Sequence, residues 1–216
     1  MEDNVKIAIL TSPDQWFIPY AKELQSKIKN SKLFYTHQSI EEEQDVIFIL
    51  SYHKIIPEKY LVKNKHNIVI HASALPAGKG WAPLFWQVLE SKSEVTFSMF
   101  EASSGVDNGD IYMRYNLNLT GTELNKELRH KQAVACMEMC IGFLENYERY
   151  RIPTPQEGAE SFYDKRGPQD SRLDLDKTIR DQFNLLRIVD NESYPAFFEI
   201  EGCTYTLKIE RQNSER

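Results

Sequence analysis

The chain alternates between short apolar runs and longer stretches in which apolar residues recur every three or four positions. The short runs predict buried β-strands, and the longer stretches predict amphipathic helices. Strands are expected at residues 5–10, 32–35, 45–50, 67–71, 95–101 and 111–119, and helices at 15–29, 57–62, 81–91 and about 120–147. This alternation predicts an α/β fold with a doubly wound, mostly parallel, Rossmann-like sheet, in which ligands bind at the carboxyl ends of the strands.

The longest predicted helix opens at Thr120-Gly-Thr-Glu123, which resembles a capping box. Cys136 and Cys140 lie one turn apart on this helix, and Cys203 is the third cysteine of the chain. Three cysteines do not make a disulfide framework, and no second pair of ligands accompanies the first two. Packing inside the protein is therefore the favoured role of Cys136 and Cys140, and no metal site is expected.

The pattern of apolar residues changes after Tyr150. The elements expected beyond it are an extended, proline-rich linker at 151–155, a helix near 175–189, and strands at 196–201 and 204–209 joined by a Glu201-Gly202 turn. We therefore divide the chain into a main domain, 1–150, and a small α+β appendage, 151–216. The tail is expected to fray from Glu210 onward.

Charge and hydropathy narrow the classes of partner. The 216 residues carry a net charge of −6, which disfavours a nucleic-acid partner because phosphate binding needs a surplus of lysine and arginine. The apolar runs are too short to cross a bilayer. An acidic N-terminus leads directly into the first strand and does not resemble a signal peptide, so a cytoplasmic location is expected.

Candidate chemistry gathers in two glycine-containing loops. His71 ends a predicted buried strand, and a loop rich in proline and glycine follows it. A histidine at that edge of the sheet can donate or accept a proton near neutral pH. A second turn, Ser103 to Asp110, contains Asp107, which could orient His71 if the two strand ends are adjacent. Taken separately, such a histidine is more often structural, and Asp-Asn-Gly-Asp is more often a simple hairpin turn.

Together the two loops resemble the folate-dependent formyltransferase family, which includes methionyl-tRNA formyltransferase, glycinamide ribonucleotide transformylase and nucleotide-sugar N-formyltransferases. That family has a strand ending in Asn-x-His, a Ser-Leu-Leu-Pro-like loop, and a later Leu-Asp-x-Gly turn. The residues at matching offsets are His71, Ser73, Leu75, Pro76, Gly80, Pro83 and Val106–Asp110. Residues 46–57 and several stretches between Lys165 and Phe197 also resemble family segments, so the likeness covers most of the chain.

The resemblance implies a catalytic domain at 1–150 that transfers a formyl group from 10-formyltetrahydrofolate to an amine, without a metal. His71 would stabilise the oxyanion of the tetrahedral intermediate, and Asp107 would support the charged imidazole and pass a proton toward the leaving nitrogen. The pterin of the folate would lie between two loops. The residues expected to contact it are Ser51, Tyr52, Ile55, Ser103, Ser104, Gly105 and Val106.

One position departs from the family pattern. The family has asparagine two residues before the histidine, and this chain has Val69 there. Asn67 is the next residue back on the same face of the strand, about 13 Å from His71 along an extended chain. Ser73, or a backbone N–H group, could supply the missing hydrogen bond. Ser73 and Asn67 are therefore candidate supporting residues.

The acceptor amine is expected to belong to a nucleotide-linked sugar, because the chain is acidic, its C-terminal region is short, and Lys79-Gly80-Trp81 lies close to His71. Lys79 could meet a diphosphate and Trp81 could stack on a base or sugar. The alternative is that Lys79 is solvated and Trp81 packs against the helix. The run from Ile70 to Trp81 most resembles formyltransferases that modify a UDP-linked 4-amino sugar in bacterial pseudaminic-acid pathways; dTDP is the other nucleotide considered.

Two other functions stay open at this stage. The first is methionyl-tRNA formylation, which needs a basic surface for the transfer RNA. The second is a non-catalytic, folate-binding relative, for which Val69 is the support. The sequence leaves open whether the chain forms a homodimer.

Overall fold

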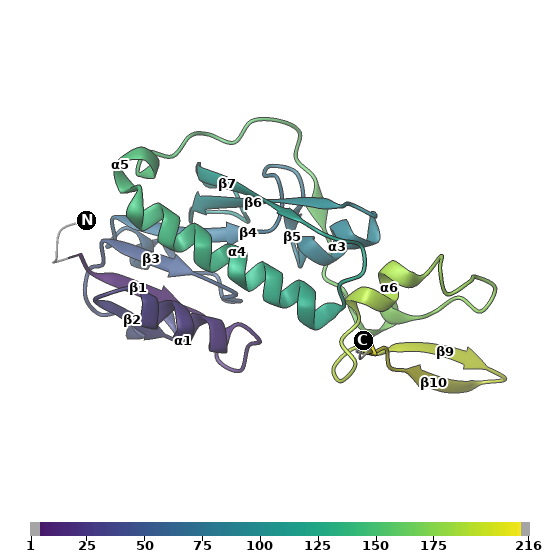
Figure 1. Ribbon diagram of the computed structural model, residues 1–216. Helices are drawn as coiled ribbons and strands as arrows, with labels where there is room; N and C mark the ends of the chain where they lie inside the picture. Colours follow the sequence, from purple (N-terminus) through teal and green to yellow (C-terminus); the bar gives the residue numbers. More distant parts are fainter. Residues whose placement is uncertain (1–4, 213–216) are drawn as a thin grey trace.

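The computed structural model describes residues 5–212, and a six-stranded sheet in the order β2-β1-β3-β4-β6-β7 forms its centre (Figure 1). The strands are β1 (Ile7–Leu10), β2 (Ser31–Phe34), β3 (Val46–Ile49), β4 (His66–His71), β6 (Glu94–Glu101) and β7 (Ile111–Asn118). The first four are parallel, whereas β6 runs antiparallel to β4 and β7 antiparallel to β6. The predicted, mostly parallel α/β sheet is therefore confirmed, with an antiparallel pair added at one edge.

The two faces of the sheet are covered unequally. Helices α1 (Ile18–Lys27), α3 (Pro83–Leu89) and α4 (Asn125–Glu145) contribute to the large apolar core on one side. The other side holds a smaller cluster, in which Tyr52 and Ile56 of a loop pack against the strands. Burial on both faces explains why the central strands read as continuous apolar runs. The shorter helices on the chain before β4 are η1 (His37–Ser39) and α2 (Glu58–Leu61).

The longest helix begins later than the sequence predicted. Glu123 does accept hydrogen bonds from the backbone N–H groups of Thr120 (2.7 Å) and Gly121 (3.1 Å), but this contact closes a turn that precedes the helix. The first helical residue of α4 is Asn125, and the N–H of Leu124 donates to Glu127 (2.8 Å). Glu123 and Glu127, four residues apart, each accept backbone N–H groups in this way. The sequence predicts the capping box at Glu123, whereas the helix itself begins at the turn closed by Glu127.

The chain after α4 adds short helices and a β-hairpin. Its elements are α5 (Tyr147–Tyr150), β8 (Phe162–Tyr163), η2 (Pro168–Ser171), α6 (Phe183–Ile188), β9 (Ala196–Ile200) and β10 (Cys203–Leu207). The predicted β9–β10 hairpin is confirmed. Helix α6 is shorter than predicted because the Gln182 side chain caps the turns before it, through hydrogen bonds to Asp174 (2.7 and 3.0 Å). Strand β8 pairs instead with β5 (Lys79–Gly80) of the main domain.

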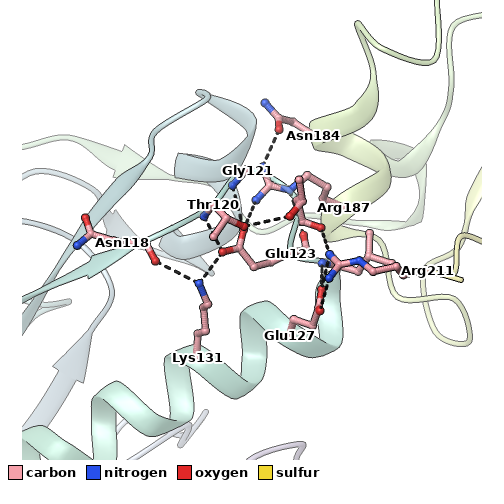
Figure 2. A network of polar contacts seen from close by, with 11 residues as sticks. Asn118, Thr120, Gly121, Glu123, Glu127, Lys131, Asn184, Arg187 and Arg211 are labelled. Carbon is pink, nitrogen blue, oxygen red and sulfur yellow. Dashed lines mark hydrogen bonds and ion pairs between the residues drawn. The ribbon is translucent and has the colours of Figure 1, made fainter. Parts of the chain in front are cut away.

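A buried ion pair joins the two parts of the chain (Figure 2). Arg187 of α6, 3% exposed, donates to the backbone oxygen and to the carboxylate of Glu123 (both 3.0 Å). Burial raises the pKa of Glu123, but hydrogen bonds from Lys131 and from the backbone at Thr120 outweigh this effect and hold the pKa at about 2. A charged, fully bonded pair therefore fixes α6 to the turn before α4.

The C-terminal tail is also attached to α4. Arg211 forms an ion pair with Glu127 (2.9 Å), so the predicted fraying does not begin at Glu210. Residues 213–216, the rest of the tail expected to fray, lie outside the described residues. Within residues 5–212, no helix combines the length and the apolar character needed to cross a membrane.

Candidate active site

His71 is the last residue of β4, and its buried ring is held by the loop that follows. Its Nε2–H donates to the backbone oxygen of Gly78 (2.8 Å). A carbonyl oxygen can only accept, so this contact places a proton on Nε2. Nδ1 has no hydrogen-bond partner among residues 5–212 and is therefore the nitrogen available to a ligand.

Asp107 lies next to this histidine. Its Oδ2 is 3.7 Å from His71 Nε2 and accepts a hydrogen bond from the N–H of Gly80 (2.9 Å). Asp107 has a left-handed backbone conformation (φ 52°), which is uncommon for a residue with a side chain. The convergence predicted from the sequence is present, and it forms a largely buried imidazole–carboxylate pair.

The predicted reason for this convergence was wrong. Asp107 was expected to follow a strand parallel to β4, but β6 is antiparallel, and the N–H of Ala102 bonds to the oxygen of Asn67 at the start of β4 (2.6 Å). The loop between β6 and β7 therefore starts beside the amino end of β4. It then runs back toward the carboxyl end of β4, where Asp107 meets His71. The turn is at once a hairpin connection and part of the site.

Gly80 allows β5 to approach β8 closely. Its φ is +96°, and a Cβ atom added there would lie 2.5 Å from the backbone oxygen of Tyr163. That oxygen accepts the N–H of Trp81 (3.0 Å), so it cannot move without breaking the β5–β8 pairing. Glycine is the residue that fits here, and its N–H is what holds the Asp107 carboxylate.

Lys79 does not lie where a substrate diphosphate could reach it. Its side chain is 1% exposed and forms an ion pair with Glu160 (2.5 Å) and a hydrogen bond with Asn108. Both sequence-based alternatives, a phosphate ligand and a solvated lysine, are corrected by this burial. Sequence reasoning could not anticipate this burial, because Glu160 lies in residues 156–174, for which no helix or strand is predicted.

Trp81 is 46% exposed, next to Gly80. The ring of His53 lies nearly parallel to it, with an interplanar angle of 20° and centroids 6.3 Å apart. The ammonium group of Lys165 is 4.9 Å from the centroid of the Trp81 ring. Trp81 therefore forms part of an open aromatic and cationic surface, and sequence reasoning did not identify His53 or Lys165 as its neighbours.

The two loops expected to hold a pterin share one apolar cluster. Tyr52, Ile56 and Ala102 all pack against the second face of the sheet. The Tyr52 hydroxyl is fixed by the Nδ1 of His37 (2.8 Å). Of the other predicted residues, Ser51 has a left-handed backbone (φ 52°), and Gly105 has a positive φ (101°) that glycine adopts readily. Ser103 and Ser104 are exposed, and Ile55 and Val106 are 88% and 55% exposed.

The two candidate supporting residues differ in their surroundings. Asn67 lies at the far end of β4, where its Nδ2 donates to Leu61 (3.0 Å) and Glu101 (3.1 Å), so a supporting role at His71 is not compatible with the structure. Ser73 is 2% exposed, and its hydroxyl has no partner among the described residues. Val69, which stands in the asparagine position of the family, packs against Leu75 and Phe100. In the described part of the chain, no cluster of three potential metal ligands occurs.

Comparison with known proteins identifies the family of the chain. A family model described as Formyl transferase matches residues 12–141, a range that includes His71 and Asp107. Methionyl-tRNA formyltransferase from Francisella philomiragia is 27% identical over 164 residues, which cover 75% of this chain and 52% of that protein. The chain spans about half the length of the curated relatives that it matches.

Three solved structures share the fold. Methionyl-tRNA formyltransferase from Clostridium thermocellum has a TM-score of 0.80 at 20% identity, over 98% of this chain and 96% of that one. A sugar N-formyltransferase from Shewanella has a TM-score of 0.71 at 14% identity, over 98% of this chain and 100% of that one. HypX from Aquifex aeolicus in complex with tetrahydrofolic acid has a TM-score of 0.78 at 18% identity, over 94% of this chain and 37% of that one. With a family model covering more than half of its length, the chain belongs to the formyltransferase family.

Proposed function

We propose that this chain transfers a formyl group from 10-formyltetrahydrofolate to the primary amine of a nucleotide-linked 4-amino-deoxy sugar, with UDP or dTDP as the nucleotide. The observation that carries the proposal is the His71–Asp107 pair, 3.7 Å apart, beside the exposed Trp81. An acid–base pair can move the protons of such a transfer, and an open aromatic surface beside it can bind a ligand that contains flat rings.

His71 has the geometry of an oxyanion donor. When the amine nitrogen bonds to the formyl carbon, negative charge develops on the formyl oxygen. A protonated His71 keeps its Nε2–H on Gly78 and presents Nδ1–H to that oxygen, while the Asp107 carboxylate stabilises the imidazolium. The bond between the formyl carbon and N10 then breaks, N10 receives a proton, and the amine loses one. His71 and Asp107 are the groups proposed to move these protons, directly or through water.

The formyl donor is proposed to bind between residues 51–56 and 102–107. The flat pterin needs an apolar slot with a few polar contacts. Tyr52, Ile56 and Ala102 supply an apolar floor, and the exposed Ile55 and Val106 are apolar side chains that such a ring would cover. The polar groups available there are those of Ser51, Ser103 and Ser104 and the backbone around Gly105. The similar fold of a tetrahydrofolate-bound HypX supports this assignment.

The acceptor nucleotide is proposed to bind over Trp81. An exposed indole offers a stacking face for a base, and Lys165, beside that ring, offers a cation for phosphate. Lys165 thus replaces the buried Lys79 in this role. The sugar N-formyltransferase that shares this fold supports a sugar acceptor, as does the net charge of −6, which disfavours a nucleic acid.

Methionyl-tRNA formylation is the second candidate, because the curated relatives carry that name. The test uses purified protein with 10-formyltetrahydrofolate and, separately, UDP- and dTDP-4-amino sugars and charged initiator transfer RNA. The proposal expects formylation of an amino sugar. Formylation of the transfer RNA alone would replace it with the second candidate, and binding of a formyl-folate analogue with silence toward every acceptor would indicate a non-catalytic relative.

The acceptor face has its own test. Trp81→Leu should raise the KM for the nucleotide sugar roughly 10-fold, since stacking on a base is worth about 1–3 kcal/mol, and should leave the affinity for the folate analogue unchanged. Lys165→Gln should raise KM by an amount that shrinks at high salt. Lys177→Gln, on an exposed lysine paired with Asp174, is the matched control. Equal KM values for all four proteins would remove Trp81 and Lys165 from the acceptor site.

A further inference from the structure

The segment Thr154–Tyr163, here called the strap, lies against both loops of the candidate site. In Figure 1 it belongs to the green chain that leaves α5, passes along the outer side of β7 and descends beside β5 and α3. We propose that the strap positions His71 and Asp107 for the reaction, and that Gln156 and Glu160 are its positioning residues. This inference rests on the function proposed above.

Gln156 holds the turn that carries Asp107. Its Nε2 donates to the backbone oxygens of Asp107 and Gly109 (both 2.8 Å). Those carbonyl oxygens can only accept, which fixes the orientation of the Gln156 amide. Its Oε1 is buried with no partner among residues 5–212. The Gln156 amide therefore keeps the orientation that bonds the Asp107 turn, although this orientation leaves its buried Oε1 without a hydrogen bond.

The other end of the strap holds the oxygen that fixes His71. Ser161 accepts the N–H of Gly78 through its hydroxyl (2.8 Å) and the N–H of Lys79 through its backbone oxygen (2.9 Å). These contacts fix the peptide whose carbonyl, at Gly78, accepts the His71 Nε2–H (2.8 Å). The ring orientation of His71 thus depends on the strap through one intervening residue.

Lys79 joins the two halves of this arrangement. Its buried ammonium contacts Glu160 of the strap (2.5 Å) and Asn108, the neighbour of Asp107. A lysine that is 1% exposed needs these partners, because an unpaired buried ammonium is unfavourable by several kcal/mol. The ion pair therefore ties the strap, the Lys79–Gly80 strand and the Asp107 turn into one unit.

The strap contributes polar contacts and little core. Residues 157–162 are exposed, and the buried residues of the large apolar cluster lie elsewhere in the chain. Loss of its hydrogen bonds should therefore displace the catalytic groups without unfolding the sheet. Displacement by about 1 Å can lower a rate by a factor of roughly 100.

The test compares Gln156→Glu with wild type, because this variant keeps the shape and removes both N–H donors. We expect kcat for formyl transfer to fall roughly 10- to 100-fold, with the folate-analogue affinity and the acceptor KM close to wild type. The new carboxylate faces two carbonyl oxygens, so the unfolding midpoint should fall as well, but the protein should stay folded at the assay temperature. Glu160→Gln should also lower kcat for formyl transfer. Glu157→Gln, on an exposed neighbour in the strap, is the matched control and should leave kcat unchanged.

A second readout does not depend on turnover. The imidazole ¹⁵N and ¹H NMR signals of His71 are assigned by their loss in His71→Asn, and Asp107→Asn gives their positions without the carboxylate. Gln156→Glu should move the His71 signals toward those of Asp107→Asn, and Glu157→Gln should not. Unmoved signals together with unchanged kcat would overturn the proposal, as would a fall in kcat matched by loss of folded protein. Shifted signals in a protein that formylates no acceptor would uphold the positioning role and reject the proposed function instead.

Discussion

The two ends of β4 each place an imidazole near a carboxylate, but the surroundings differ. At its start, Glu101 accepts hydrogen bonds from the Tyr112 hydroxyl (2.6 Å) and from Asn67 (3.0 and 3.1 Å). The Tyr112 hydroxyl donates its hydrogen bond to this carboxylate, so its oxygen accepts from Nδ1–H of His66 (2.9 Å). Nε2 of His66 in turn accepts from the Tyr147 hydroxyl (2.8 Å). Both ring nitrogens and both carboxylate oxygens are occupied.

At the other end of β4 the polar groups are incompletely bonded. Nδ1 of His71 and the hydroxyl of Ser73 have no partner within the described part of the chain, nor does Oε1 of Gln156. Asp107 and Ser51 hold left-handed backbone conformations. A saturated buried network stabilises a fold, whereas unbonded polar atoms and strained backbone collect where a ligand binds. The contrast teaches that the polar atoms a histidine–carboxylate pair leaves unbonded are the structural reason to propose a function for it.

The largest expected effect is on catalysis at the His71 end. Asp107→Asn keeps an oxygen that can accept the Gly80 N–H but removes the charge 3.7 Å from the imidazole. We expect kcat to fall roughly 100- to 1000-fold, as for loss of other electrostatic stabilisers, with folate-analogue affinity unchanged. Steady-state kinetics and calorimetry measure the two quantities. A kcat within threefold of wild type would mean that the carboxylate is not needed.

The next effect is on stability at the opposite end. Glu101→Ala leaves the Tyr112 hydroxyl and the Asn67 amide buried without their acceptor, which should lower the free energy of unfolding by roughly 2–3 kcal/mol. Formyl transfer by the folded fraction should stay within twofold of wild type, since Glu101 contacts Asn67 at the start of β4 and Tyr112 of β7, and not His71. Urea unfolding followed by circular dichroism gives the stability. A large loss of kcat without loss of stability would reverse the roles of the two ends.

A smaller effect is expected where the same network reaches α5. Tyr147→Phe removes the hydroxyl bonded to His66 Nε2 (2.8 Å) and keeps the ring that packs edge-on against Phe143. One lost hydrogen bond should lower the free energy of unfolding by about 1 kcal/mol. Tyr150→Phe on the same short helix is the matched control. Equal unfolding midpoints for the two variants would show that the Tyr147 hydroxyl is not a working member of the network.

The smallest effect is a pH dependence of stability. Burial, and then the nearby Lys65 and Arg151, lower the pKa of His66 below its ordinary value of 6.5. Because the unfolded chain takes up a proton that folded His66 resists, stability should decrease as pH falls below 6.5 toward the lowered pKa. His66→Gln should show a shallower slope in unfolding free energy between about pH 7 and 5. Identical slopes would show that His66 does not contribute to this dependence.

The sheet, and the position of Asp107 next to His71, could be predicted from the sequence for different reasons. Strands such as Val46–Ile49, buried on both faces, leave an unbroken apolar run that any buried parallel strand would show. Asp107 was identified through a family resemblance, and the geometric reason given for it failed because antiparallel pairing has no signature in a single strand. The two residues that converge in the structure were therefore named on a mistaken topology.

Other features could not be read from the sequence. The strap has no apolar periodicity, because its contacts are hydrogen bonds from side chains such as Gln156 to backbone far along the chain. The burial of Lys79 depends on Glu160, 81 residues later, and no local pattern reports such a pairing. The surface around Trp81 likewise combines His53 and Lys165 from two distant segments.

The central claim is that formyl transfer takes place at His71. The most direct test is the single-turnover rate of formyl transfer by His71→Asn, with 10-formyltetrahydrofolate and a nucleotide-linked 4-amino sugar both saturating. We expect the rate to fall roughly 100- to 1000-fold, while the free energy of unfolding stays within about 1 kcal/mol of wild type because one hydrogen bond, to Gly78, is lost. A rate within threefold of wild type would contradict the assignment of the reaction to this end of β4.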